Sequence, residues 1–253
     1  MKHFDLRNQV VDAARGLNKT GLSAGTSGNV SVRVEPDGGF LITPSGVPYE
    51  KLRAEDIVKM DMDGTPAAGS LRPSSEWQFH RDIYGERGSA KAIVHAHPPY
   101  CTALACTGHG IPPFHYMVAV AGGKDIRLAP YHIYGSEELS KAALEALAGR
   151  RACLLAHHGL IAFSDTAEKA LRLAVEVEDI AHQFSIVLQL GDPKLLSEAE
   201  MEAVLNKFWT YGDNAQRSEN RKEGRRGPKT AATISYPKLV PKKTEAQTKK
   251  DRL

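Results

Sequence analysis

The sequence has few cysteines and no long apolar run. Its three cysteines, Cys101, Cys106 and Cys153, are an odd number and contain no CxxC pair. We therefore expect neither a disulfide framework nor a thiolate zinc site, and any metal has to use imidazole and carboxylate ligands. No apolar run approaches the roughly 20 residues of a membrane helix, and residues 1–7 carry charge where a signal peptide needs apolar residues. We expect a cytoplasmic protein with no membrane partner.

Charge is unevenly distributed along the chain. Residues 1–212 hold 21 Lys and Arg against 25 Asp and Glu, whereas residues 213–253 hold 12 against 5. The net charge of +3 therefore comes from the C-terminal part and does not indicate a nucleic-acid-binding domain. Apolar periodicity stops after Gly212, so we predict a folded domain over 1–212 and a basic, disordered tail over 213–253. An arm that binds nucleic acid or another acidic partner is the alternative role for this tail.

Strand and helix patterns mix irregularly within residues 1–212. Short β-like runs are found at 30–34, 40–43, 57–61, 92–95 and 153–156. Helical patterns are found at 6–17, at 73–84, from about Asp165 onward and at 200–211. Pro98 and Pro99 are expected to end the strand before them. There is no internal repeat and no regular βαβ alternation, so the pattern predicts a layered α/β domain other than a TIM barrel or Rossmann fold.

Two pairs of histidines indicate a metal site. His95 and His97 are two residues apart, so on a strand both imidazoles project from one face and can reach one cation. His157 and His158 stand at the end of a second predicted buried strand. Because neighbouring residues of a strand point to opposite faces, only one of this pair is expected to bind the metal. Three imidazoles with an open fourth position are typical of catalytic zinc. The other histidines show no such grouping and are predicted to be structural; they are His3, His80, His109, His115, His132 and His182.

Three short segments have a composition suited to phosphate. They are residues 25–29, 43–46 and 73–75, which are rich in Gly, Ser, Thr and Asn. Glycine lets the backbone approach an anion, and hydroxyl and N–H groups donate to it. The third segment also precedes a predicted helix, whose N-terminus favours negative charge. Each segment alone is an ordinary turn or cap, and none matches a nucleotide-binding loop, so the prediction depends on their meeting in space.

Six motifs follow one another in a distinctive order. They are GTSGNVSVR at 25–33, ITPSGVPYEKL at 42–52, PSSEW at 73–77, HAH at 95–97, HYM at 115–117 and HHGL at 157–160. Their order and spacing resemble the class II aldolase/adducin family over about residues 1–212. The resemblance implies a three-layer α/β/α domain with a central, largely antiparallel sheet. It also implies a homotetramer whose sites lie at subunit interfaces.

The resemblance also assigns roles to individual residues. It implies one zinc ion per subunit, or another divalent transition metal, and its ligands would be Glu76, His95, His97 and His158. Glu76 would also be the catalytic acid/base, and Tyr116 a catalytic proton donor that reaches the site of a neighbouring subunit. Tyr211 matches an aromatic residue that covers the site. The implied substrate-binding positions for the phosphate are Gly28, Asn29, Ser45, Gly46, Ser74 and Ser75.

The implied reaction is the reversible cleavage of a ketose 1-phosphate, such as L-fuculose 1-phosphate. The products would be dihydroxyacetone phosphate and a small aldehyde resembling L-lactaldehyde. Alternatives within the family are a 4-epimerase of the L-ribulose-5-phosphate type, a sugar-acid phosphate decarboxylase and a dehydratase. The epimerase tends to carry Asp at the position of Glu76, which favours the aldolase. Tyr134 stands where a phenylalanine is expected, which leaves the exact aldehyde open. A non-catalytic adducin-like module is a further alternative, but such modules lose metal ligands that this chain retains.

Overall fold

A mixed β-sheet forms the middle layer of the protein. The computed structural model describes residues 1–36 and 38–208, and in this part of the chain the sheet has seven strands in the order β3-β2-β1-β4-β7-β6-β5. The strands are β1 (Asn29–Arg33), β2 (Phe40–Ile42), β3 (Val58–Met60), β4 (Ala92–Ala96), β5 (Leu128–Ala129), β6 (Ala152–Leu155) and β7 (Gly159–Ser164). Every neighbouring pair is antiparallel except β5 and β6. The prediction of a largely antiparallel sheet is confirmed.

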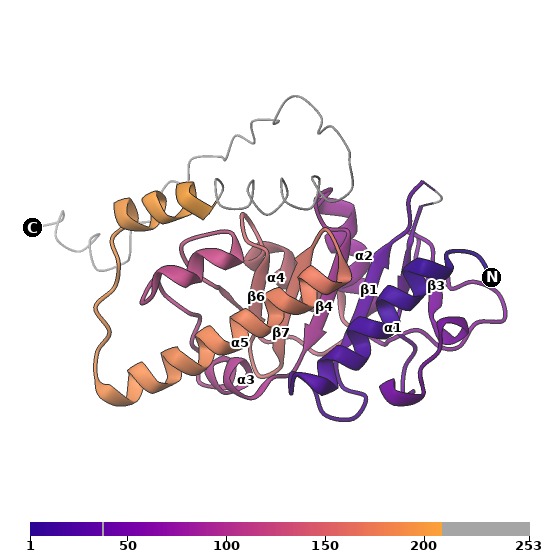
Figure 1. Cartoon of the computed structure of the whole chain (residues 1–253), viewed down its shortest axis with the longest axis horizontal. Coiled ribbons are helices and arrows are strands. Elements are labelled where there is room, and N and C mark those ends of the chain that lie inside the picture. The colour runs from indigo at the N-terminus through magenta and orange to yellow at the C-terminus, as the bar shows by residue number, and fades with distance from the viewer. Residues whose placement is uncertain (37, 209–253) are drawn as a thin grey trace, which may run out of the picture. The chain divides into compact units, whose positions relative to one another are not determined.

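Helices cover both faces of this sheet (Figure 1). One face carries α1 (Phe4–Lys19), α3 (Pro99–Cys106) and α5 (Ala167–Leu190), and the other carries α2 (Trp77–Glu86) and α4 (Glu137–Ala146). Because strand side chains alternate between faces, the buried residues separate into two hydrophobic cores, one on each side of the sheet. The three-layer α/β/α arrangement is therefore confirmed. Short 3₁₀ helices lie at Tyr49–Lys51, Ala54–Asp56 and Tyr116–Ala121, and residues 198–208 are helical.

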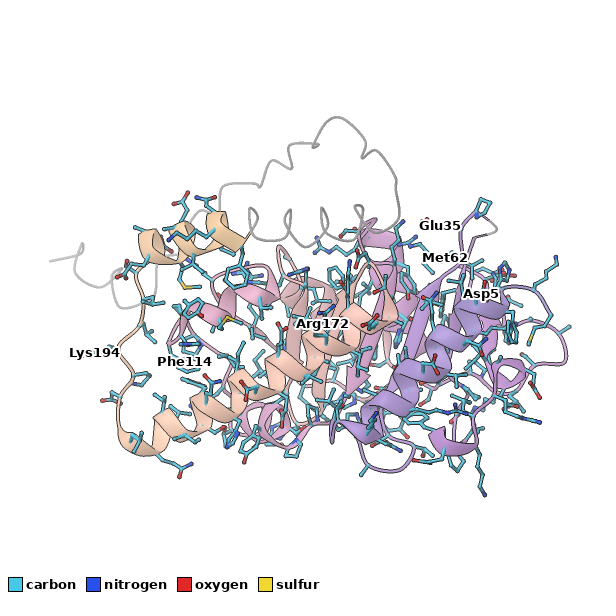
Figure 2. All side chains as sticks on the ribbon, in the orientation of Figure 1. Asp5, Glu35, Met62, Phe114, Arg172 and Lys194 are labelled. Atoms are coloured by element: carbon cyan, nitrogen blue, oxygen red, sulfur yellow. The ribbon has the colours of Figure 1, made fainter. Side chains whose placement is uncertain are left out.

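Helices α1 and α5, which cover the same face of the sheet, are amphipathic. The inner side of α1 buries Val10, Ala14 and Leu17 against the sheet. On α5 the side chain of Arg172 is exposed on the outer surface of the helix (Figure 2). Burial of one apolar stripe per helix is the main source of stability for elements of this kind.

One predicted helix boundary differs from the structure, and one predicted strand end agrees with it. The helix expected from Asp165 has Thr166 as its N-cap, because the Thr166 hydroxyl accepts the Lys169 N–H at 3.2 Å. Asp165 instead pairs with the Lys169 ammonium at 2.9 Å. Pro98 and Pro99 do more than end β4: Pro99 opens α3, where the missing N–H has no helical partner to lose.

Several predictions concern residues outside the described part of the chain. The basic tail at 213–253, the end of the helix predicted at 200–211, and Tyr211 all lie there. Within residues 1–36 and 38–208, no helix is long and apolar enough to cross a membrane. The three cysteines are free, and burial raises the pKa of the Cys153 thiol to about 12.

Candidate metal centre

The sheet topology brings segments that are distant in sequence to the same end of three neighbouring strands. Strands β1, β4 and β7 are neighbours that alternate in direction, so the start of β1, the end of β4 and the start of β7 coincide. In this register Asn29 pairs with His95, and Ala96 pairs with Leu160. Glu76, the N-cap residue of α2, lies beside these strand ends. The motifs at 25–33, 73–77, 95–97 and 157–160 therefore meet at one place.

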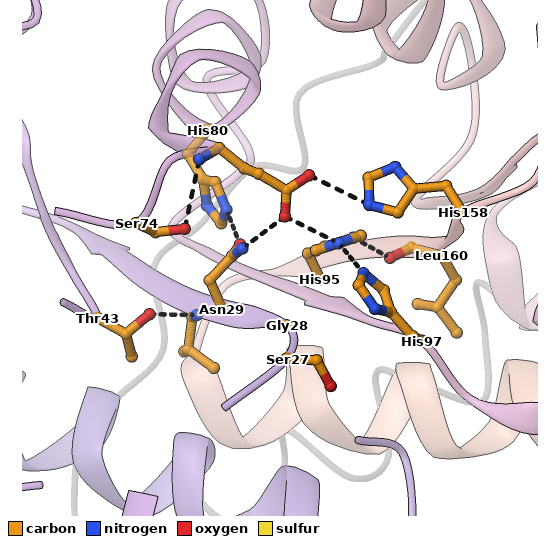
Figure 3. Close-up of polar contacts among 12 residues, drawn as sticks. Ser27, Gly28, Asn29, Thr43, Ser74, His80, His95, His97, His158 and Leu160 are labelled. Atoms are coloured by element: carbon orange, nitrogen blue, oxygen red, sulfur yellow. Dashed lines mark hydrogen bonds and ion pairs between the residues drawn. The ribbon is translucent and has the colours of Figure 1, made fainter. Parts of the chain in front are cut away.

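Four side chains converge there on one centre (Figure 3). Glu76, His95, His97 and His158 each offer a ligand atom, and these atoms all lie within 4.8 Å of one another. The Nε2 atoms of His95 and His97 are 2.8 Å apart. Glu76 Oε2 lies 3.2 Å from His95 Nε2, and Glu76 Oε1 lies 3.2 Å from His158 Nε2. These are the four residues that the resemblance implies as ligands.

The donor set has the chemistry of a divalent metal site. His95 Nδ1–H donates to the Leu160 carbonyl oxygen at 2.8 Å, so the lone pair of His95 Nε2 faces the centre. Glu76 Oε1 is buried and, among the described residues, has no hydrogen-bond donor with suitable geometry. Lone pairs and a carboxylate that crowd one buried point repel one another unless a cation lies between them. Imidazole and carboxylate are ligands that zinc accepts.

The protonation states favour metal binding. Burial lowers the pKa of His97 to about 3, so its ring is neutral near pH 7. Burial alone would raise the pKa of Glu76, but its close contacts with His95 and His158 lower it below its ordinary value. Glu76 is therefore ionised and His97 has a free lone pair, which are the forms that coordinate a cation.

A tight turn selects one histidine of the second pair. Strand β6 ends at Leu155, so His157 and His158 lie in the turn before β7 and not on a strand as predicted. His157 adopts a left-handed backbone with φ of 54°, and its ring contacts Tyr131, whereas His158 faces Glu76. The two side chains point in different directions, as expected. The turn causes this divergence, and the alternation of side chains along a strand does not. A Cβ atom on Gly159 would lie 2.3 Å from the Ala96 carbonyl oxygen, so only glycine lets this turn lie against β4.

The predicted phosphate segments also converge. The Ser45 N–H donates to the Arg72 carbonyl at 2.9 Å and the Ser74 N–H to the Thr43 carbonyl at 3.0 Å, which joins residues 43–46 to residues 73–75. They border a cavity of about 360 Å³, a size suited to a small ligand. The six predicted positions all line this cavity; they are Gly28, Asn29, Ser45, Gly46, Ser74 and Ser75.

Two of these six residues also form hydrogen bonds with Glu76, whose carboxylate is a candidate metal ligand. The Asn29 side-chain amide is 2% exposed and donates to Glu76 Oε2 at 3.0 Å. The Ser74 hydroxyl accepts the Glu76 N–H at 3.4 Å. Gly28, which precedes Asn29, has φ of 84°, and a Cβ atom there would lie 2.6 Å from the His95 carbonyl oxygen. Glycine at this position therefore lets the loop approach the metal-binding strand.

The structure does not bring every predicted residue into this site. Tyr116, at the start of a 3₁₀ helix, is 50% exposed and is not among the residues that line the cavity. The resemblance assigned it to the site of a neighbouring subunit, so its place outside its own cavity leaves that prediction open.

Sequence reasoning missed several residues at the site. His132, predicted to be structural, and Tyr131, which no sequence signal marked, line the cavity beside Tyr134 and His157. His80, also predicted to be structural, is fully buried and lies 2.5 Å from Asn29, with its Nε2 against Oδ1. Residues 76, 80 and 84 share one side of a helix, so this spacing was a signal that could have linked His80 to Glu76.

Comparison with known proteins identifies the family. The family described as "Class II Aldolase and Adducin N-terminal domain" matches residues 8–184, and the chain belongs to it. The chain is 54% identical over 211 residues to a 5-methylthioribulose-1-phosphate/5-deoxyribulose-1-phosphate aldolase of Rhodospirillum rubrum, which covers 83% of this chain and 94% of the relative. It is 47% identical over 213 residues to the L-fuculose phosphate aldolase of Escherichia coli, with 84% and 98% covered.

A solved structure agrees with this assignment. The fold matches an L-fuculose 1-phosphate aldolase with a TM-score of 0.79 and 40% identity, over 82% of this chain and 98% of that one. The chain is therefore a class II aldolase, a lyase. Class II aldolases are metal-dependent, and the group of one glutamate and three histidines is the candidate site for the metal.

Proposed function

We propose that the protein reversibly cleaves a ketose 1-phosphate into dihydroxyacetone phosphate and a small aldehyde. The observation that carries the proposal is the group of four ligand atoms within 4.8 Å of one another, beside a cavity lined by the Gly and Ser segments. The metal is zinc in this proposal, held by Glu76, His95, His97 and His158. The named relatives act on different sugars, yet their substrates share the ketose 1-phosphate end. That shared end is the part that this proposal assigns to the cavity.

The phosphate binds the Gly and Ser segments in this account. Ser45, Ser74 and Ser75 offer hydroxyl donors, and the backbone around Gly28 and Gly46 offers N–H groups without a side chain in the way. The start of α2 adds the favourable field of a helix N-terminus. Binding energy from the phosphate then holds the ketone at the metal centre, although the phosphate itself does not react.

Carbon–carbon cleavage next to a ketone leaves an enediolate, whose negative charge has to be stabilised. A divalent ion held by Glu76 and the three histidines would supply that stabilisation as a Lewis acid. In the synthesis direction the ionised Glu76 carboxylate would accept the proton from the hydroxymethyl carbon of dihydroxyacetone phosphate, and in cleavage it would return that proton to the enediolate carbon. Tyr116 of a neighbouring subunit exchanges the hydroxyl proton of the aldehyde half. The site then needs a second copy of the chain, in keeping with a homotetramer.

The cavity wall next to His157 decides which aldehyde fits. Tyr131, His132 and Tyr134 belong to one exposed loop that borders the cavity, and they are suited to contact the part of the sugar away from the phosphate. Cleavage of L-fuculose 1-phosphate, 5-methylthioribulose 1-phosphate or 5-deoxyribulose 1-phosphate leaves the same dihydroxyacetone phosphate. The three substrates therefore differ only in the aldehyde that meets this loop.

The test is aldol synthesis with identified products. The protein, loaded with zinc, is incubated with dihydroxyacetone phosphate and separately with L-lactaldehyde, acetaldehyde and (methylthio)acetaldehyde. We expect a ketose 1-phosphate with at least one of them, detected by mass spectrometry and NMR, and the preferred aldehyde names the substrate. L-Ribulose 5-phosphate is included to detect epimerisation. Epimerisation without any aldol product would contradict the proposal.

A further inference from the structure

Strand β1 and helix α2 carry polar residues at matching intervals. Asn29, Ser31 and Arg33 alternate along one face of β1, and that face lies against α2. Glu76, His80 and Tyr84 recur every four residues from the N-cap of α2. Two strand residues advance about 6.7 Å and four helical residues about 6.0 Å. Because the two intervals nearly match, each polar residue of the strand meets its counterpart on the helix.

These residues form a continuous buried chain of hydrogen bonds. Glu76 Oε2 contacts the Asn29 amide nitrogen at 3.0 Å, and Asn29 Oδ1 contacts His80 Nε2 at 2.5 Å. His80 Nδ1 contacts the Ser31 hydroxyl at 2.7 Å, which in turn contacts the Tyr84 hydroxyl at 2.8 Å. All five side chains belong to residues that are at most 6% exposed. Figure 3 shows the contact between Asn29 and His80 within this chain.

The direction of every bond in this chain is determined. An ionised carboxylate only accepts, so the Asn29 amide nitrogen donates to Glu76 and its oxygen must accept from His80 Nε2–H. His80 is neutral, because burial lowers its pKa to about 3. Its Nδ1 therefore accepts from the Ser31 hydroxyl, whose oxygen accepts from Tyr84 O–H. Each hydrogen bond sets the orientation of the next group toward Glu76.

The imidazole at position 80 is also held rigidly. Its ring stacks on Phe79 with centroids 4.7 Å apart and planes at 23°. Phe79 contacts the His95 ring edge-on at 5.4 Å. The ring that orients Asn29 is therefore packed in the same cluster as a candidate metal ligand, and it cannot turn without disturbing that cluster.

We propose that His80 is a positioning residue: it fixes the Asn29 amide, and through Asn29 it aims the Glu76 carboxylate at His95 and His158. The inference rests on the proposed role of Glu76 as metal ligand and proton carrier. If Asn29 were free to rotate by half a turn, its oxygen would face the Glu76 carboxylate and repel it. Hydrogen-bonded groups behind metal ligands commonly tune affinity or activity by about 10- to 100-fold.

A pair of variants at position 80 tests this role. His80→Leu removes the donor to Asn29, whereas His80→Gln keeps an amide N–H near the position of Nε2. We expect His80→Leu to bind zinc about 10-fold or more weakly and to lower kcat by about 10- to 100-fold, with KM changed by less than about threefold. His80→Gln is expected to recover both properties to within about threefold. Zinc affinity is measured by competition with a chromophoric chelator, without substrate.

Ser140→Ala is the matched control. Ser140 is fully buried and its hydroxyl donates to Asp82 on α2 at 2.6 Å, but it lies outside the chain that ends on Glu76. Its removal is expected to leave zinc affinity and kcat unchanged. If His80→Leu does not fold, His80→Met replaces it, since the flexible thioether fills the space without a donor.

Two results would overturn the inference. The first is an apolar residue at position 80 that leaves zinc affinity and kcat within threefold of wild type. The second is His80→Gln with the same losses as His80→Leu. Failure of the proposed function gives a different pattern: the wild type would then form no aldol product, while zinc affinity would still follow residue 80.

Discussion

At the scale of single residues, the site depends on the orientation of a few ring nitrogens and one carboxylate. His95 is fixed by its hydrogen bond to the Leu160 carbonyl, and Glu76 by the Asn29 amide. The first contact uses His95 Nδ1, so the lone pair of His95 Nε2 stays free toward the centre. The second contact uses Glu76 Oε2 and holds the carboxylate with Oε2 facing His95 and Oε1 facing His158. This preorganisation lets four residues from three regions of the sequence act as one ligand set.

Replacement of the carboxylate separates metal binding from proton transfer. Glu76→Gln keeps the size of the side chain and the three histidines but removes the carboxylate that accepts the proton. We expect zinc to be retained at one ion per chain and kcat to fall about 10²-fold or more. Metal analysis and steady-state kinetics on the same sample check both parts. Near-normal turnover would remove Glu76 from the acid/base role.

The two histidines of the β6–β7 turn make a matched pair of variants. His158→Asn removes a proposed ligand, whereas His157→Asn changes a neighbour that lines the cavity without facing Glu76. Asparagine tolerates the left-handed backbone at 157, so this control is not strained. We expect zinc affinity to fall at least about 100-fold in His158→Asn and to stay within about threefold in His157→Asn. Equal zinc affinities in the two variants would contradict the assignment.

At the scale of elements, much of the fold could be predicted from local patterns. The apolar periods of α1 and α5 and the short runs of β1, β2, β3, β4 and β6 are local properties. The HAH and HHG motifs likewise mark the candidate metal ligands within a few residues of sequence. The buried chain from Asn29 to Tyr84 could not be predicted in this way. It depends on the register between a strand and a helix more than 40 residues apart, which no local pattern contains.

The packing of α2 against β1 predicts a pH dependence of stability. The pKa of His80 is about 3 in the folded chain against an ordinary 6.5, so below pH 6.5 the unfolded chain binds a proton that the folded chain does not. The unfolding free energy of the metal-free protein therefore falls as pH drops from about 6.5 toward 3. One such group contributes a slope of up to about 1.4 kcal/mol per pH unit.

His80→Gln isolates this contribution, since glutamine does not titrate. The measurement is urea denaturation of both proteins between pH 7 and 4. The unfolding free energy of the variant is expected to fall less steeply with decreasing pH, by an amount that corresponds to the uptake of close to one proton. His97 and Glu76 titrate in both proteins, so they cancel in the difference. Parallel curves would show that residue 80 is already protonated in the folded chain.

At the scale of the whole molecule, one chain does not hold the complete set of groups that the proposed reaction uses. The cavity contains Glu76 and the phosphate segments, but Tyr116 is exposed elsewhere on the surface. In the proposed homotetramer, Tyr116 of one copy reaches the site of the next.

Mixed oligomers test this arrangement. Glu76→Gln and Tyr116→Phe are each expected to lose most activity when assembled alone. When the two variants are unfolded together and refolded, some sites receive an intact Glu76 from one copy and an intact Tyr116 from the other. We expect up to about one quarter of the wild-type activity to return in an equal mixture, because half of the chains keep each residue. An equal mixture with no more activity than its separate components would contradict a shared site.

The central claim is that a divalent metal at Glu76, His95, His97 and His158 is required for aldol cleavage. The most direct measurement is removal of metal with a chelator, followed by titration with zinc while ketose 1-phosphate cleavage is recorded. We expect activity to disappear with the metal and to return in proportion to zinc, with a plateau at one ion per chain. Full activity in protein shown by elemental analysis to hold no metal would contradict the account.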